Sequence, residues 1–368
     1  MTSSLDIADQ AAAMRAELVG RLVDEGLLTD EAWRAAFEEV PAHAFVPAFY
    51  DYSGHRIAED DPATRGQWLS EVYSDRPLVT HRTDGAATSS RSEPSLMAGM
   101  LDALQVEPGM KILEIGTGTG YNAALMSHRL GSDNVTTIDV VAELTEAARE
   151  RLADVGYQPV VDTGNGALGC PLYAPYHRII ATCRVDTIPV PWVRQLTDDG
   201  FILAPISGAL ARVRRTGRES AEGRFLAGGA FFMPLRNEPA DGVPHKAPEF
   251  PKNPGRASTL PLDMLANNDF RFLTGVVARG LVWQYDFDDE RQITAARVWA
   301  ADGSVASVDG DTVAEAGPRG LWSLLESAYR AFDDAGHPSA DRYGITVDGP
   351  EQWVWLETPG GLRWKLNS

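Results

Sequence analysis

The segment Lys111–Tyr121, which reads KILEIGTGTGY, constrains the fold of this chain more than any other stretch. A short apolar run carries one acid, and three glycines then alternate with threonines before an apolar helical pattern begins. This order predicts a buried parallel strand, a tight turn and the start of a helix. The glycines let the backbone pass close to a ligand, because no Cβ intervenes. The spacing is Gly-x-Gly-x-Gly, and Tyr121 stands where a dinucleotide fingerprint has its third glycine.

Strand and helix patterns alternate after this loop, as in a doubly wound α/β domain. Apolar runs predict further strands at Asn134–Val140, Pro159–Thr163, Arg178–Thr182 and Phe201–Ile206. Helical spacing predicts helices at Asn122–Leu130, Val141–Val155 and Val190–Thr197. A hairpin of Ala211–Arg215 with Phe225–Pro234 is expected to finish the sheet. The predicted fold class is a Rossmann-like, doubly wound α/β sheet with an antiparallel terminal hairpin.

The residues before the glycine loop predict helices and irregular chain. Apolar residues at helical spacing over Ala8–Phe37 predict two helices, with a new helix cap at Thr29–Glu31. The polar segment Tyr50–Arg82 is interpreted as a covering segment outside the sheet. The small-residue stretch Thr80–Pro94 is expected to be a loop, followed by a helix that starts at Pro94 and ends near Leu104.

A chain of 368 residues is long enough for more than one domain. The composition shifts to Pro, Asn, Lys and Gly after residue 235, which predicts a linker. Beyond it, a small α+β domain is expected, with strands within Asp263–Trp283, Gln292–Val308 and Gly344–Trp364, a turn at Ala301–Gly303 and a helix at Trp322–Asp334. The predicted division is 1–79 (N-terminal helices and covering segment), 80–235 (core), 236–260 (linker) and 261–368 (accessory domain).

Bulk composition excludes several classes of function. With 33 basic and 52 acidic residues the formal charge is -19, which argues against nucleic-acid and membrane partners. Met1–Gln10 lacks the apolar core of a secretory signal and no stretch approaches the roughly 18 apolar residues of a membrane span, so a cytoplasmic protein is expected. Cys170 and Cys183 are interpreted as packing thiols. No metal is expected, because three histidines form no evident ligand set: His81, His128 and His177.

The glycine turn and the next strand together predict a nucleoside-type ligand. Asp139 ends that strand, 19 residues after Gly120, where an acid accepts hydrogen bonds from a ribose diol. The turn lacks the Gly-Lys-[Ser/Thr] of a P-loop, which argues against a nucleoside triphosphate. A Gly-x-Gly-x-Gly turn after a strand glutamate favours S-adenosylmethionine, and NAD stays an alternative.

The segment Ile112–Tyr121, with Ser92-Glu93-Pro94 upstream, resembles the protein-L-isoaspartate O-methyltransferase family. Further matching segments are Val40–Pro47, Tyr73–Leu78, Ala174–Thr182 and Ile188–Gly200. The resemblance covers residues 32–235 and keeps the family's order of motifs. It implies a class I methyltransferase sheet and S-adenosylmethionine as the methyl donor.

The resemblance also implies roles for individual residues. The cofactor-binding residues would be Glu114, Gly116, Thr117, Gly118, Thr119, Gly120, Asp139, Asn165 and Gly166. Within this set the glycines would pass under the methionine part, Glu114 would orient the loop and Asp139 would hold the ribose. Asn165 stands where the family usually has Asp, and its amide would still meet the adenine edge. The acceptor would be contacted by Ser89, Ser90, Arg91 and Thr182.

Ser92 would lie beside the donor methyl and the acceptor carboxylate. A carboxylate is already ionised at neutral pH, so this reaction needs no general base, and Ser92 would position the acceptor rather than abstract a proton. Two simpler interpretations stay open: Ser92 caps the helix that begins at Pro94, and Arg91 is an exposed loop arginine.

The family's usual role is the repair of isoaspartyl residues in proteins. Two features favour a different acceptor: the loop before Ser92 departs from the family's glycine-rich Gly-x-Gly-Gln-Thr-Ile form, and the chain extends well beyond the core. Extended members resemble methyltransferases that methylate an ordinary aspartate in a constrained, ribosomally made peptide, giving an aspartimide or isoaspartate. This is our leading hypothesis, with a peptide partner recognised by the C-terminal domain. The alternatives are repair, a non-catalytic nucleoside-binding scaffold and an NAD oxidoreductase. The sequence gives no oligomeric state.

Overall fold

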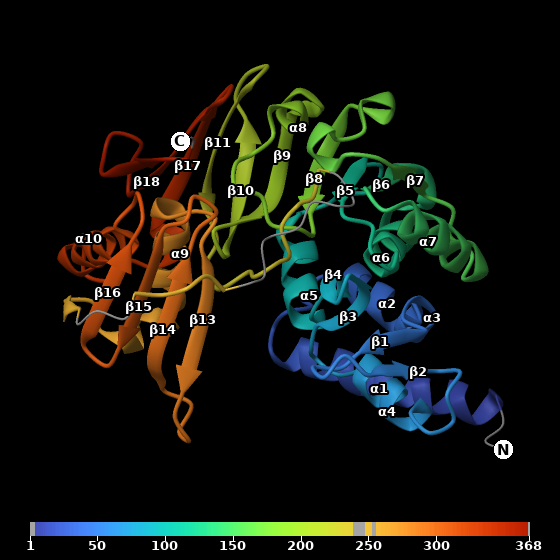
Figure 1. Ribbon diagram of the computed structural model, residues 1–368. Coiled ribbons are helices and arrows are strands. Elements are labelled where there is room, and N and C mark those ends of the chain that lie inside the picture. Colours follow the sequence, from blue (N-terminus) through green and yellow to red (C-terminus); the bar gives the residue numbers. More distant parts are fainter. Residues whose placement is uncertain (1–3, 238–246, 252–254, 367–368) are drawn as a thin grey trace. The chain divides into compact units, whose positions relative to one another are not determined.

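The structure, a computed structural model, describes residues 4–237, 247–251 and 255–366 (Figure 1). The chain divides into two compact units. The first comprises Met1–Cys183, Pro191–Leu203 and Met233–Pro239. The second comprises Arg184–Val190, Ala204–Phe232 and Ala240–Ser368. Two features differ from the division expected from the sequence: the N-terminal helices share a unit with the glycine loop, and the hairpin after residue 204 joins the C-terminal residues.

The first unit holds the parallel sheet. Its strands are β5 (Ile112–Ile115), β6 (Val135–Asp139), β7 (Val160–Thr163), β8 (Tyr176–Ala181) and β9 (Leu196–Ile206), in the order β7-β6-β5-β8-β9. All four pairings are parallel. Every residue of β5 is buried, as expected for a central strand covered on both faces. The Rossmann-like, doubly wound fold class is confirmed.

Helices pack on this sheet and on one another. They are α5 (Pro94–Ala103), α6 (Tyr121–Leu130), α7 (Ala142–Asp154) and α8 (Val190–Arg194). The N-terminal helices are α1 (Ser4–Asp24), α2 (Glu31–Glu39), α3 (Ala42–Phe45) and α4 (Arg65–Val72). The predicted cap of α2 is confirmed, because Asp30 Oδ1 accepts the Ala32 and Trp33 amides at 2.7 and 3.1 Å. Short 3-10 turns occur at Ser132–Asn134, Gly166–Leu168, Pro171–Tyr173, Leu262–Ala266 and Ala340–Arg342.

The regions predicted as an irregular covering segment and a loop contain helix α4 and the strands of a small antiparallel sheet. Its strands are β1 (Ala48–Tyr50), β2 (Arg56–Ala58), β3 (Leu78–Thr83) and β4 (Ala86–Arg91), in the order β2-β1-β3-β4. The loop predicted at Thr80–Pro94 is therefore wrong, and a hairpin occupies most of it. Asp84 and Gly85 have φ of 51° and 81°, the backbone that a two-residue hairpin turn needs.

The second unit contains two antiparallel arrangements. The last three residues of β9 lead into β10 (Ala209–Arg215), β11 (Ser220–Phe225), β17 (Tyr343–Asp348), β18 (Glu351–Leu356) and β19 (Arg363–Lys365). The other sheet has the order β12-β16-β15-β14-β13. These strands are β12 (Arg256–Ala257), β13 (Val282–Phe287), β14 (Ile293–Trp299), β15 (Val305–Asp309) and β16 (Thr312–Ala316). With α9 (Asn268–Val277) and α10 (Leu321–Asp334), the second unit confirms the predicted α+β class.

Two predicted strands are wrong. The hairpin partner of β10 is β11, so only Phe225 of the predicted Phe225–Pro234 strand belongs to it. The stretch predicted as a strand at Asp263–Trp283 forms a 3-10 turn and then α9, and only its last two residues belong to a strand, β13. Asn267 caps this helix by accepting the Phe270 amide at 2.9 Å. The predicted turn between β14 and β15 is confirmed, because the Ala300 amide donates to the Ser304 carbonyl at 3.0 Å.

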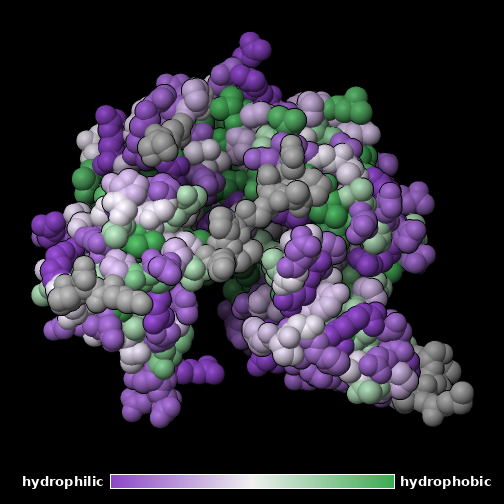
Figure 2. Space-filling view, viewed as in Figure 1, coloured by the Kyte–Doolittle hydropathy of each residue, from purple (hydrophilic) through white to green (hydrophobic). Residues whose placement is uncertain are grey.

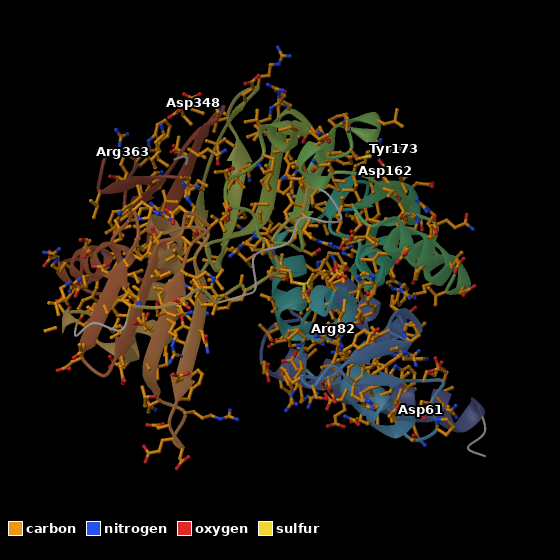
Figure 3. The ribbon with its side chains drawn as sticks, viewed as in Figure 1. Asp61, Arg82, Asp162, Tyr173, Asp348 and Arg363 are labelled. Carbon is orange, nitrogen blue, oxygen red and sulfur yellow. The ribbon has the colours of Figure 1, made fainter. Side chains whose placement is uncertain are left out.

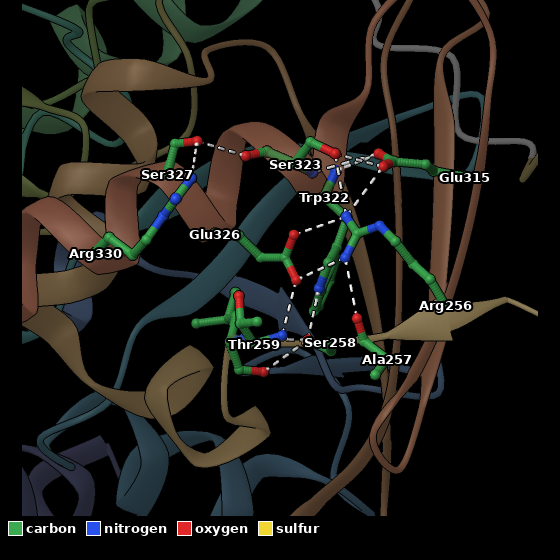
Figure 4. Close-up of polar contacts among 11 residues, drawn as sticks. Arg256, Ala257, Ser258, Thr259, Glu315, Trp322, Ser323, Glu326, Ser327 and Arg330 are labelled. Carbon is green, nitrogen blue, oxygen red and sulfur yellow. Dashed lines mark hydrogen bonds and ion pairs between the residues drawn. The ribbon is translucent and has the colours of Figure 1, made fainter.

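The end of the predicted linker folds onto the second unit (Figure 4). Residues 238–246 and 252–254 of that linker lie outside the described residues. The Arg256 guanidinium binds Glu326 through two contacts of 2.8 and 2.7 Å and also reaches Glu315 at 3.2 Å. The Glu326 side chain is only 9% exposed, and its Oε1 also accepts the Thr259 amide at 2.8 Å. This network fastens β12 to α10.

Hydrophilic residues dominate the face seen in Figure 2, with hydrophobic ones in separate groups. In residues 4–237, 247–251 and 255–366, no helix combines the length and the apolar character that a membrane span requires.

We expect Arg256→Ala to lower the free energy of unfolding by about 2 kcal/mol at neutral pH, because it leaves the nearly buried Glu326 carboxylate without its cationic partner. Burial opposes ionisation of Glu326, but hydrogen bonds from Arg256 and Thr259 outweigh it and hold its pKa below the ordinary value. The stabilisation should therefore be complete above the ordinary glutamate pKa and disappear as the pH falls below it. Urea unfolding at several pH values measures this.

Arg319→Ala is the matched control. Arg319 is similarly exposed and pairs at 2.6 Å with Asp302, a partner that is itself exposed, so its removal should leave stability unchanged. Equal effects of the two substitutions would contradict the role given to Glu326.

Candidate functional site

None of the three glycines in the loop between β5 and α6 can be replaced by another residue without backbone strain or a steric clash. Gly116 has φ of 101°, and a Cβ there would lie 2.7 Å from Thr182 Oγ1. Gly120 has φ of 87°, and its Cβ would lie 3.1 Å from the Cβ of Ala148 on α7. Gly118 has φ of 51°. Positive φ at all three positions favours glycine, and the absence of side chains there leaves the loop backbone uncovered at the carboxyl end of β5.

Glu114 anchors this loop from within the sheet. Its side chain is fully buried and accepts Asn122 Nδ2 and Thr137 Oγ1, each at 2.7 Å. Thr137 in turn lies 2.8 Å from Thr117 Oγ1 in the loop. Burial raises the pKa of Glu114 to about 7, because little solvent reaches the carboxylate. Glu114 thus connects β5 with α6 and β6, as its predicted orienting role requires.

Asn122 and Thr137 were not found by sequence reasoning. Each lies close in sequence to a predicted element of the site, Asn122 in the first turn of α6 and Thr137 two residues before Asp139. For Thr137 the available signal was a polar residue inside an apolar strand, since buried polar side chains are normally hydrogen-bonded.

Asp139 ends β6 and holds the middle of the loop. Its Oδ2 accepts the Gly118 amide at 3.0 Å and its Oδ1 accepts the Val141 amide at 3.2 Å. Each carboxylate oxygen has a second lone pair, and the side chain is partly exposed. The remaining acceptor capacity fits a ribose diol, and the uncovered loop fits the rest of an S-adenosyl ligand.

Asn165 and Gly166 follow β7 at the same edge of the sheet. Asn165 Oδ1 accepts the Ala167 amide at 2.9 Å, so the side chain caps a short turn through its oxygen. A Cβ on Gly166 would lie 2.8 Å from Ile115 Cγ2, which explains the glycine. Binding of adenine by Asn165 stays a prediction, and its amide nitrogen is the group left for it.

Strand β4 brings the predicted acceptor residues against the glycine loop. A Cβ on Gly118 would lie 3.4 Å from Ser89 Oγ and 3.9 Å from the Ser90 carbonyl oxygen. Ser89 is only 8% exposed. Residues that are far apart in the sequence, at positions 89–90 and 116–118, therefore share one site.

Arg91 is buried, and its interpretation as an exposed loop arginine is wrong. Its side chain is 4% exposed and donates to the carbonyl oxygens of Val72 at 2.7 Å and Ser92 at 3.3 Å. Its Nε is buried without a hydrogen-bond partner among the described residues. Burial lowers the pKa of Arg91 to about 10, which still leaves it charged at neutral pH. Arg91 thus stabilises the backbone at Ser92 through its hydrogen bonds to the Ser92 and Val72 carbonyl oxygens.

The capping interpretation of Ser92 is also wrong. Helix α5 has Glu93 at its cap position, without a side-chain cap bond, and its Ser95 amide is accepted by Asp75 Oδ1 at 2.9 Å. Within the part of the chain that the structure describes, the Ser92 hydroxyl has no hydrogen-bond partner. It is therefore available to a ligand.

Thr182 lies at the end of β8, against the glycine loop. Its hydroxyl donates to the carbonyl oxygens of Ile115 and Gly116 at 3.1 and 2.8 Å. These bonds support the loop, and contact with an acceptor stays a prediction.

The thiols and histidines show no reactive arrangement. Burial raises the pKa of Cys183, and burial with the neighbouring Asp162 (Figure 3) raises that of Cys170 to about 12, so both stay protonated near neutral pH. The three histidines have separate partners. The described residues contain no group of three or more His, Cys, Asp or Glu side chains arranged to hold a metal ion.

The chain is similar to known methyltransferases. The family model described as protein-L-isoaspartate(D-aspartate) O-methyltransferase matches residues 13–238. The chain is 34% identical over 228 residues to the protein-L-isoaspartate O-methyltransferase of Methanothermobacter thermautotrophicus, covering 60% of this chain and 94% of that protein. It is 33% identical over 226 residues to the enzyme of the same name from Gloeobacter violaceus, covering 59% and 98%.

A solved structure described as protein-L-isoaspartate O-methyltransferase shares the fold. It matches with a TM-score of 0.55 and 22% sequence identity, and the match covers 94% of this chain and all of that chain. The fold of the C-terminal extension therefore also occurs in a protein of that name.

We expect Asp139→Asn to weaken binding of S-adenosylmethionine, the ligand predicted from the sequence, by roughly tenfold or more. The substitution removes the charge and one acceptor oxygen, and a charge-assisted hydrogen bond contributes about 1.5–3 kcal/mol. Isothermal titration calorimetry measures the dissociation constant. Glu143→Gln is the control, because that carboxylate is nearby in α7 but 85% exposed. Unchanged affinity in the Asp139 variant would rule out its role as a ligand-binding group.

Proposed function

The chain belongs to the protein-L-isoaspartate(D-aspartate) O-methyltransferase family, and we propose that it methylates an aspartate side chain in a constrained, ribosomally made peptide. The ester would then collapse to an aspartimide or isoaspartate. S-adenosylmethionine supplies the electrophilic methyl group. The enzyme's own residues bind this donor at the glycine loop and position the acceptor carboxylate beside it.

The observation that carries the proposal is the Ser92 hydroxyl. It has no partner among the described residues and directly follows β4, whose Ser89 and Ser90 lie against Gly118. A hydroxyl in this place can donate to one oxygen of an acceptor carboxylate and fix its direction.

The scarcity of catalytic groups supports the same reaction class. An aspartate carboxylate is ionised and nucleophilic at neutral pH, so the site needs no general base. The two thiols have raised pKa values and stay protonated near neutral pH, and the Glu114 carboxylate is hydrogen-bonded to Asn122 and Thr137. What the site supplies is alignment of the reactants and exclusion of water.

The part of the site expected to bind the acceptor, residues 80–94, favours a constrained peptide, and we call it the acceptor half. It is a paired hairpin whose end is held by the buried Arg91, rather than a loop of glycines. A rigid acceptor half selects a substrate whose backbone already has the required shape, because neither partner then loses much conformational freedom.

A second candidate is repair of L-isoaspartyl residues in proteins. It is supported by the relatives named protein-L-isoaspartate O-methyltransferase, because the match to this chain covers 94% and 98% of their lengths. The C-terminal extension does not distinguish the two candidate functions, because a solved structure described as protein-L-isoaspartate O-methyltransferase matches 94% of this chain.

The two candidates are separated by acceptor preference. The enzyme is incubated with labelled S-adenosylmethionine and either a macrocyclic aspartyl peptide or a linear isoaspartyl peptide. Our proposal predicts methyl transfer to the cyclic aspartate with at least tenfold higher kcat/KM. Efficient turnover of generic linear isoaspartyl peptides would overturn it in favour of repair. Donor binding without transfer to either peptide would indicate a scaffold.

We expect Ser92→Ala to lower kcat/KM by roughly tenfold, the equivalent of one hydrogen bond of about 1.4 kcal/mol, while donor affinity is unchanged. Ser95→Ala is the matched control, since the Ser95 hydroxyl lies one turn away and donates to Glu93 at 3.0 Å. Radiolabelled methyl transfer gives the rates. If the two substitutions had equal effects on kcat/KM, Ser92 would have no special part in the reaction.

A further inference from the structure

The second unit contains a cavity of its own, lined from α9, β13 and nearby turns. Its volume is about 190 Å³. Every lining residue belongs to the second unit. Cofactor and drug-sized sites usually measure roughly 300–1,000 Å³, so this cavity fits a side chain or two of a peptide rather than a nucleoside cofactor.

Positive charge is concentrated at this cavity. Three arginines line it, Arg184, Arg271 and Arg279, against a single acid, Asp186. The chain as a whole carries a formal charge of -19. A basic cavity in an acidic protein attracts an anionic group locally and gives the protein a preferred point of contact for it.

Aromatic side chains also line the cavity. The rings of Trp283 and Tyr285 stack on β13 with centroids 5.6 Å apart and 12° between their planes. Phe231 is 51% exposed, and the Arg271 guanidinium lies over its ring at 4.4 Å. An arginine held flat on an aromatic ring keeps its edge donors free for bidentate binding of a carboxylate.

Two of these arginines, Arg184 and Arg271, have unused donor capacity within the described residues. The Arg271 guanidinium has the Phe231 ring as its neighbour and no carboxylate partner there. Arg184 Nε is buried without a hydrogen-bond partner in the same part of the chain. A buried donor such as Arg184 Nε is normally compensated by an acceptor, and an anion is the strongest one.

We propose that this cavity binds a carboxylate side chain, flanked by aromatic or apolar residues, in an acidic segment of the methyl-accepting peptide. The inference rests on the proposed function for the identity of the peptide. Two linked binding sites on one chain raise the effective concentration of the acceptor, so the second unit would contribute affinity and selectivity rather than chemistry.

The test uses the full chain and two labelled synthetic peptides. In one, an acceptor Asp held in a macrocycle is followed by alternating Glu and Phe, and in the other each Glu is replaced by Gln. Fluorescence anisotropy should show at least tenfold tighter binding of the Glu peptide, and the difference should shrink with added salt. Equal binding of the two peptides would overturn the inference, as would equally effective competition by inorganic phosphate at the same concentration.

Arg271→Gln should weaken binding of the Glu peptide about tenfold and leave the Gln peptide unaffected. Arg184→Gln is the second variant, and matched thermal unfolding checks that both remain folded. Arg363→Gln is the control, because Arg363 (Figure 3) also lies over an aromatic ring of this unit, Trp353 at 5.9 Å, but does not line the cavity. Loss of binding in the control to the same extent would contradict the assignment.

Turnover separates this inference from the proposed function. Arg271→Gln should raise KM for the Glu peptide about tenfold with kcat unchanged. If both peptides are methylated with equal KM, the cavity inference fails and the proposed function stands. If neither is methylated but the Glu peptide binds in an Arg271-dependent way, the proposed function fails and the cavity is still an acidic-peptide site.

Discussion

The glycine loop and Asp139 form the donor half of the site, and their arrangement depends on the buried carboxylate of Glu114. An acid enclosed at the end of β5 is stable only if its oxygens find donors. Both do, at 2.7 Å, from Asn122 on α6 and Thr137 on β6. These bonds fix the relative positions of three elements whose ends surround the glycine loop. The loop conformation is thus a consequence of one satisfied buried acid together with three glycines.

The donor half could be predicted from the sequence because its signals are local. The glycine turn, the strand glutamate and Asp139 lie within a single strand–turn–helix–strand unit, and the apolar periods of α6, α7 and β6 agree with the observed bounds to within one residue. Here helical and strand patterns do not compete, so local preference and tertiary packing point to the same structure.

The acceptor half and α9 could not be predicted in the same way. The β3–β4 hairpin is built mostly of residues that are polar or small, which show no apolar alternation. The burial of Arg91 depends on the Val72 carbonyl, which only the fold brings near. In α9, Phe270, Phe272 and Val276 alternate like a strand, but the helix is buried around most of its circumference. Each failure occurs where long-range packing decides the outcome.

The pairing of β11 with β17 has a consequence for how this enzyme can be divided. The second unit takes residues from 204–232 as well as from the C-terminal part, so no single cut separates it from the first. A chain truncated before β17 would keep β10 and β11 but leave the five residues of β11 that pair with β17 without their partner strand. Such an open edge, with its free amides and carbonyls, is a template for association with other chains. The C-terminal residues therefore also act as an edge cover that keeps the sheet from aggregating.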